Sequence, residues 1–168
     1  MTDEAGLLEI EKDRKTKTAV ICPVIKTAAG MMTAEEEAAR ENEAAGLVLA
    51  MGQEVVFCET VRMSAIVPKS FFGKGTLERL RTACEEKDAE LLVVDMPVSA
   101  VQQRNLEKML NMKVIDRTAG FLEIFGQRAQ TREGKLQVEL AHLTYQRGRL
   151  VRSWTHLERQ RGGGRTGN

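Results

Sequence analysis

Residues 91–116 read LLVVDMPVSAVQQRNLEKMLNMKVID, and this stretch decides the fold because it predicts a strand, a helix and a second strand in succession. The run 91–95 is short and apolar, as is typical of a parallel strand buried on both faces. Ser99 and Gln102 match the capping-box pattern that opens a helix, and the second strand follows at 113–116. Because a β-helix-β unit crosses over with right-handed geometry, the stretch indicates a parallel sheet.

Two further units of the same kind precede this stretch. Residues 18–25 (TAVICPVI) and 54–61 (EVVFCETV) are apolar, β-branched runs of strand length. Between them, Thr33 and Glu36 form a second capping-box pattern that opens a helix. The glycine turn FFGKGT (71–76) leads into another helix. The sequence therefore predicts an α/β fold with a four-stranded parallel sheet flanked by helices, and we expect the strand order 2-1-3-4.

The C-terminal third has a different character. Residues 121–125 indicate a short amphipathic helix, and Thr131 is a candidate N-cap for a long basic helix. Along that helix, apolar residues recur with the 4-3 spacing of a coiled-coil seam, which needs a facing helix. No second long helix follows in this sequence, so we expect half of a helical hairpin, completed by a returning helix or by another molecule. The seam consists of Leu136, Leu140, Leu143, Leu150, Trp154 and Leu157.

Two residues weaken the seam. Arg147 takes a position that the spacing reserves for an apolar side chain. Gly148 follows it, and glycine costs about 1 kcal/mol relative to alanine in a helix interior. The sequence thus predicts a weak point near Gly148, where the helix could kink or break.

The charges are distributed unevenly, although the net charge is only +1. Up to Asp116 there are 15 Lys and Arg against 20 Asp and Glu, whereas from Arg117 onward there are 10 against 4. A basic C-terminal part on an acidic N-terminal part suggests a polyanionic partner. The alternative is a solvated helix whose arginines keep it soluble.

Cysteine usage and hydropathy indicate the cellular compartment. Cys22, Cys58 and Cys84 form no CxxC or Cys/His cluster, which favours buried, reduced thiols. The N-terminal residues lack an apolar signal core, and no apolar run approaches the ~18 residues that a membrane span requires. We therefore expect a cytoplasmic protein.

Several enzymatic motifs are absent. FFGKGT is not a GxxxxGK(S/T) phosphate loop, so Gly73, Lys74 and Gly75 read more simply as a turn into a helix beginning near residue 76. Backbone N–H groups at that helix start are still able to hold a phosphate, which makes a nucleotide-binding α/β domain the alternative function. Asp95 and Asp116 end strands where α/β ligand sites form, and they either line a crevice or cap turns.

Motifs for metal binding and GTP recognition are also missing. His142 and His156 lack an HExxH context, which favours packing or solvated roles over metal binding. No NKxD base-reading motif occurs, and the DxxG string Asp3–Gly6 lies in the charged N-terminal stretch rather than after a predicted strand. We conclude that these residues do not contain a complete GTPase domain, and we expect the chain itself to be no enzyme and to need no cofactor.

Specific strings then carry a family resemblance. QRNLE (103–107), VIDRT (114–118), TREGKLQVELA (131–141) and WTHLERQ (154–160), in this order and spacing, resemble the N-terminal region of the HflX-type ribosome-associated GTPases. The likeness covers nearly the whole chain from about Val55. It implies an α/β domain, then a helical hairpin, then a GTPase domain that uses GTP and Mg²⁺ and is lacking here.

The resemblance also implies a function. Such proteins bind the large ribosomal subunit and help separate stalled ribosomes into subunits. The glycine-rich loop between their hairpin helices reaches ribosomal RNA near the peptidyl transferase centre. On this basis we expect an α/β domain over 1–117, the first hairpin arm over 118–161 and a truncated glycine-rich loop over 162–168. The expected partners are the large subunit and its RNA, the missing GTPase domain and returning helix, and a second copy through the seam.

Residue chemistry supports an RNA contact. Arginine grips phosphates and stacks on unpaired bases, while glycine lets the backbone approach RNA closely. Tyr145, which lies off the seam, either stacks on a base or packs, whereas packing is favoured for Trp154 on the seam. The residues expected to contact RNA are Arg147, Arg149, Arg152, Arg159, Arg161, Gly162, Gly163, Gly164, Arg165 and Gly167.

Overall fold

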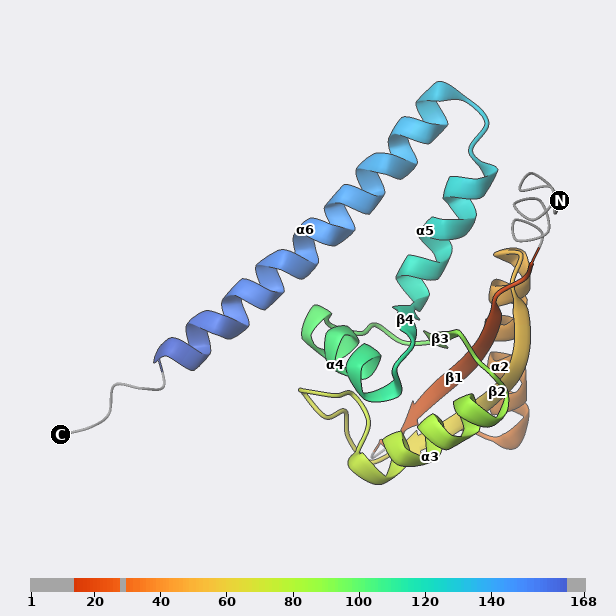
Figure 1. The fold of residues 1–168 in the computed structure, drawn as a ribbon, viewed down its shortest axis with the longest axis vertical. Helices are drawn as coiled ribbons and strands as arrows, with labels where there is room; N and C mark the ends of the chain where they lie inside the picture. Colours follow the sequence, from red (N-terminus) through yellow and green to blue (C-terminus); the bar gives the residue numbers. More distant parts are fainter. Residues whose placement is uncertain (1–13, 28–29, 163–168) are drawn as a thin grey trace, which may run out of the picture.

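Four parallel strands form one sheet with helices on both faces (Figure 1). The computed structural model describes residues 14–27 and 30–162, with 149–162 described by their backbone alone. The strand order is β2-β1-β3-β4, which confirms both the α/β prediction and the expected order. The elements are β1 (Lys17–Ile25), α2 (Ala34–Ala50), β2 (Glu54–Met63), α3 (Lys74–Glu86), β3 (Leu91–Val94), α4 (Ala100–Leu110), β4 (Lys113–Asp116), α5 (Arg117–Arg128) and α6 (Arg132–Gly162).

The core lies on both faces of the central strand β1. Ala19 and Ile21 are fully buried in the cluster shared with α3 and α4, while Val20 and Cys22 are fully buried in the cluster shared with α2. Successive side chains of a strand point to opposite faces, so a continuous apolar run suits a strand covered on both sides. Residues of α2 and α5 form a third cluster, in which Ile124 packs with the α2 side.

The helix starts follow local signals. Both capping boxes are present: the Glu36 backbone N donates to Thr33 Oγ1 at 3.2 Å, and the Gln102 backbone N donates to Ser99 Oγ at 3.1 Å. The helix α3 begins at Lys74 rather than near residue 76, because the extended Gly73 acts as its N-cap. Prediction from the sequence placed this start too late, since glycine offers no side-chain cap to recognise.

The two last helices form a hairpin of unequal lengths, in which the long helix α6 runs back beside α5 and then past α4 (Figure 1). We call α6 the arm and the elements from β1 to α5 the body. The arm continues through Gly148 to Gly162, so the break that the sequence allowed there is absent. A Cβ atom added at Gly148 would meet no atom within 4 Å.

The described part of the seam faces away from the body. Leu136, Leu140 and Leu143 are 56%, 64% and 56% exposed. The opposite side of the arm holds the half-buried Val138 and Tyr145, which face α5 and the end of β4. The seam is therefore not covered by the described body.

No helix in the described ranges is both long and apolar enough to cross a membrane.

Candidate functional site

A buried carboxylate, Asp95, lies at the carboxyl edge of the sheet, immediately after β3. Arg40 Nε donates to Asp95 Oδ2 at 3.1 Å, and the same guanidinium donates to the backbone oxygens of Asp95 at 2.8 Å and Pro23 at 2.6 Å. Arg117 adds a contact of 3.3 Å to Asp95 Oδ1. Ligands of open α/β sheets bind where the strand order reverses, here between β1 and β3. A protein guanidinium occupies this position, which gives Asp95 a structural role.

The second strand-end carboxylate, Asp116, also binds protein groups. Its Oδ1 accepts hydrogen bonds from the Ala119 backbone N and from the Tyr145 hydroxyl, both at 3.0 Å. Its Oδ2 accepts from the Val98 backbone N at 3.1 Å. One carboxylate therefore caps α5, holds the loop before α4 and contacts the arm. Of the two roles left open by the sequence, the structure supports capping for Asp116, whereas Asp95 pairs with Arg40 and Arg117 and lines a groove between α2 and α5.

The Gly73-Lys74-Gly75 turn lies on the surface at the start of α3. The two phenylalanines before it, Phe71 and Phe72, are fully buried, and Phe71 has a positive φ of 66°. Their rings pack edge to face with centroids 4.8 Å apart. The motif thus anchors α3 in the core through its aromatic residues, and its glycines remain exposed.

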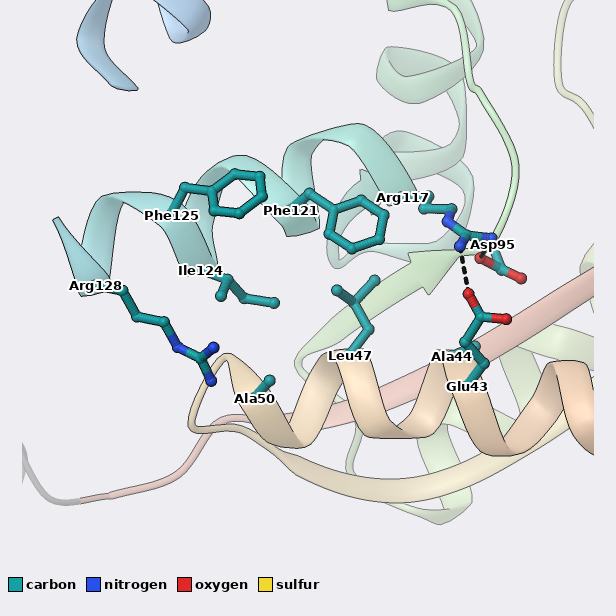
Figure 2. Close-up of a pocket in the computed structure, with 10 residues that line it drawn as sticks. All are labelled: Glu43, Ala44, Leu47, Ala50, Asp95, Arg117, Phe121, Ile124, Phe125 and Arg128. Carbon is teal, nitrogen blue, oxygen red and sulfur yellow. Dashed lines mark hydrogen bonds and ion pairs between the residues drawn. The ribbon is translucent and has the colours of Figure 1, made fainter. Parts of the chain in front are cut away.

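A groove of about 300 Å³ separates α2 from α5 (Figure 2). Leu47 of α2 and Phe121 and Ile124 of α5 point into it. At one end Arg117 pairs with Glu43 at 2.5 Å and lies 5.3 Å from the centre of the Phe121 ring. This groove was not predictable from the sequence, because the spacing of the α5 apolar residues marks a packing face without locating its partner.

The predicted RNA-contact residues lie on the arm and beyond it. Arg147 is exposed on α6. The positions 149, 152, 159, 161 and 162 belong to the helical backbone of α6, and their side chains lie outside the description. Gly163, Gly164, Arg165 and Gly167 lie outside the described residues. The structure therefore places Arg147 on the surface and leaves the remaining contacts as predictions.

The described residues contain no cluster of His, Cys, Asp and Glu that fits a metal ion. The three cysteines are free thiols, and Cys58 is half-buried rather than buried. Contact between Cys22 and Cys58 raises the pKa of the Cys22 thiol, and the same contact lowers the pKa of Cys58. Burial raises the pKa of Cys84 to about 11.

Comparison with known families matches both parts of the chain. A family model described as "GTP-binding GTPase N-terminal" matches residues 38–126, and one described as "GTP-binding GTPase Middle Region" matches 128–168. The two models meet at the end of α5, whereas the boundary expected from the sequence lies at residue 117, where α5 begins.

Individual relatives agree with the family models. The GTPase HflX of Magnetococcus marinus is 52% identical over 122 residues, which are 73% of this chain and 28% of that protein. The GTPase HflX of Escherichia coli is 46% identical over 122 residues, which are 73% of this chain and 29% of that protein. The chain thus spans less than a third of the length of these curated relatives.

A solved structure shares the fold. The crystal structure of a GTP-binding protein from Sulfolobus solfataricus in complex with GDP matches with a TM-score of 0.59 and 22% identity, covering 87% of this chain and 42% of that chain. At this identity the likeness shows the fold alone. The family models and the closely related sequences together place the chain: it belongs to the HflX family of GTPases and corresponds to the N-terminal part of its members.

Proposed function

We propose that this chain is a binding and positioning module that docks on the large ribosomal subunit through its RNA and performs no chemistry of its own. The proposal rests mainly on the arm, a helix of 31 residues whose far half extends beyond α5 (Figure 1). Arg132, Lys135 and Arg147 are exposed along it, and further arginines follow in the same helix. Such a row of cations suits the phosphate backbone of RNA, whose counterions it displaces.

The proposal extends to the full-length protein. The glycine-rich segment after the arm approaches ribosomal RNA, and the protein helps separate stalled ribosomes into subunits in the cytoplasm. The GTPase domain and the returning helix are its expected partners within the same molecule. Membership of the HflX family supports this extension, as does the uncovered seam.

The test is the salt dependence of binding to large-subunit RNA. We expect the chain to bind at low salt and the logarithm of its affinity to fall linearly with the logarithm of the salt concentration. Arg147→Gln should reduce that slope by about 1, as for the loss of one phosphate contact. The matched control is Arg81→Gln, which removes an exposed arginine of α3 that pairs with Glu85. An affinity that does not change with salt concentration, or no binding at low salt, contradicts the proposal.

We further propose that GTP binding and hydrolysis belong to the part of the relatives that this chain does not match. The absence of an NKxD motif and of a GxxxxGK(S/T) phosphate loop from the sequence supports this assignment. Calorimetry with GTP and ATP separates it from the alternative of a nucleotide-binding α/β domain. Under that alternative, Lys74→Ala abolishes nucleotide binding, whereas under the RNA-binding proposal the same substitution leaves RNA binding nearly unchanged. Measurable GTP turnover by the purified chain would overturn the assignment.

A further inference from the structure

The arm packs against α5 and α4, and hydrogen bonds fix it at two described places. The first is the turn after α5, where the Ala129 backbone N donates to the Phe125 carbonyl at 3.0 Å and the Gly134 backbone N donates to Thr131 Oγ1 at 2.9 Å. The second lies further along the arm, where the Tyr145 hydroxyl donates to Asp116 Oδ1 at 3.0 Å. A turn by itself is a hinge, so the direction of the helix depends on the packing of the arm and on this second hydrogen bond.

The carboxylate at the second attachment is firmly held. Asp116 ends β4, is 5% exposed and also accepts hydrogen bonds from the backbone N–H groups of Val98 and Ala119. These bonds connect it to the sheet, to the loop before α4 and to the start of α5. A hydroxyl bound to an ionised carboxylate makes a stronger bond than a neutral pair does. The hydroxyl of Tyr145 is therefore bound to a point that is fixed relative to the sheet.

We propose that Tyr145 is a positioning residue, which sets the direction in which the arm leaves the body through its hydrogen bond to Asp116. This role replaces the base-stacking role that the sequence left open, because the side chain is half-buried and its hydroxyl binds the body. The importance of the direction for RNA contact rests on the proposed function. The hydrogen bond between Tyr145 and Asp116 is independent of the proposed function.

The length of the arm makes its direction consequential. At a rise of 1.5 Å per residue, the helix extends about 25 Å from Tyr145 to its described end at Gly162. A tilt of about 10° at Tyr145 displaces the far end by roughly 4 Å. Such a displacement is large enough to break a hydrogen bond, whose donor and acceptor lie about 3 Å apart. Arginines near that end would then lose contact with phosphates that they otherwise reach.

Residual dipolar couplings of the uniformly ¹⁵N-labelled chain test the proposal, since they report helix direction without introduced labels. In the wild type we expect the amides of the sheet and of residues 132–147 to fit one alignment tensor. In Tyr145→Phe, which removes only the hydroxyl, the arm amides should require a separate, weaker tensor, while those of the sheet and α5 keep the original one.

The matched control is Thr144→Val, because the Thr144 hydroxyl donates to the Leu140 carbonyl at 2.8 Å within the arm itself. This variant should retain a single tensor. If Tyr145→Phe also retains one tensor with the same arm direction, the proposal is wrong. If its sheet and α5 couplings change as well, Tyr145 stabilises the whole fold and does not specifically direct the arm, which likewise overturns the proposal.

Binding to large-subunit RNA provides the second readout. Because Tyr145→Phe leaves the net charge unchanged but removes preorganisation, we expect its affinity to fall roughly threefold to tenfold relative to Thr144→Val. An affinity equal to that of the control contradicts the functional consequence of the arm direction. If the wild type itself does not bind RNA, the proposed function fails, and the couplings still decide the role of Tyr145.

Discussion

Arg40 donates hydrogen bonds to three oxygen atoms at the carboxyl edge of the sheet, one from the Asp95 carboxylate and two from the backbone. The Asp95 side chain is 3% exposed and that of Arg40 is 21% exposed. Removing one partner of a buried ion pair leaves the other charge poorly compensated. We expect Arg40→Ala to lower the free energy of unfolding by about 2–3 kcal/mol, as measured by urea denaturation.

The control for this prediction is an exposed pair. Arg81 and Glu85 lie one helical turn apart on α3, with side chains 57% and 67% exposed. Arg81→Ala should change the free energy of unfolding by no more than about 0.5 kcal/mol. Equal losses in the two variants would show that burial does not determine the contribution of Arg40.

The buried thiol of Cys84 predicts a dependence of stability on pH. Its pKa is raised by burial from 9.0 to about 11, so between these values the unfolded state loses a proton that the folded state keeps. The contribution of this thiol to the free energy of unfolding is therefore fully present below pH 9 and is lost as the pH rises toward 11, by up to about 3 kcal/mol. Urea unfolding across this range measures the fall. In Cys84→Ala the fall of the free energy of unfolding between pH 9 and 11 should be smaller by this amount. An unchanged fall would show that other groups cause it.

Residue by residue, the sequence located the strand-end aspartates but not their partners. Asp95 and Asp116 stand out because each follows an apolar strand. Arg40 lies 55 positions before Asp95, and Tyr145 lies 29 positions after Asp116. No local pattern connects such pairs, since the fold alone brings them together. For the same reason, the choice between ligand crevice and capping required the structure.

At the scale of elements, a glycine inside the arm lowers the stability of the helix. Gly148 lies in α6, and an added Cβ meets nothing within 4 Å. Gly148→Ala should therefore stabilise the helix by about 1 kcal/mol. Hydrogen exchange of the arm amides near residue 148 should slow accordingly, while exchange in the sheet stays unchanged.

The opposite result is expected at the end of α2. Gly52 has a φ of +78°, a backbone conformation that alanine adopts with strain. Gly52→Ala should lower the free energy of unfolding by about 1 kcal/mol. If Gly148→Ala and Gly52→Ala both stabilised or both destabilised the protein, the difference in backbone conformation would not explain their effects.

Element boundaries were predictable wherever a side chain marks them. Thr33 and Ser99 accept from the backbone three residues ahead, so their capping boxes are visible in the sequence. The start of α3 lacks such a mark, because its N-cap is Gly73. The uninterrupted arm at Gly148 also differs from the expectation, since a weak helix former does not break a helix that is otherwise continuous.

For the molecule as a whole, the uncovered seam is expected to drive self-association while contributing little to the stability of the fold. Leu136, Leu140 and Leu143 are more than half exposed, so they contribute little to the fold of the chain. We expect replacement of all three by glutamine to change the free energy of unfolding by less than about 1 kcal/mol. The wild type should self-associate with rising concentration, and the triple variant should not.

Analytical ultracentrifugation at two concentrations measures this difference. As a control, Leu49 of α2 is also exposed but lies outside the seam, and Leu49→Gln should leave association unchanged. Identical sedimentation of the wild type and the triple variant would indicate that the seam does not drive self-association.

The overall architecture was accessible from the sequence, whereas the shape of its surface was not. Apolar runs and helix signals specify the alternation of strands and helices, and hence a parallel sheet with two covered faces. The groove between α2 and α5 depends on how closely Leu47 approaches Ile124 and Phe121, which follows from packing rather than from periodicity. The exposure of the seam agrees with its 4-3 spacing, which predicts a facing helix that the described body does not supply.

The strand order has a consequence for protein synthesis. β2 pairs with β1, β3 then pairs on the other side of β1, and β4 pairs with β3. Each strand that leaves the exit tunnel therefore meets a neighbour that has already been translated. At translation rates of about 5–20 residues per second, the nascent chain has time to add strands in the order of their synthesis. Tyr145 emerges after all four strands, and it meets a carboxylate that is already in place.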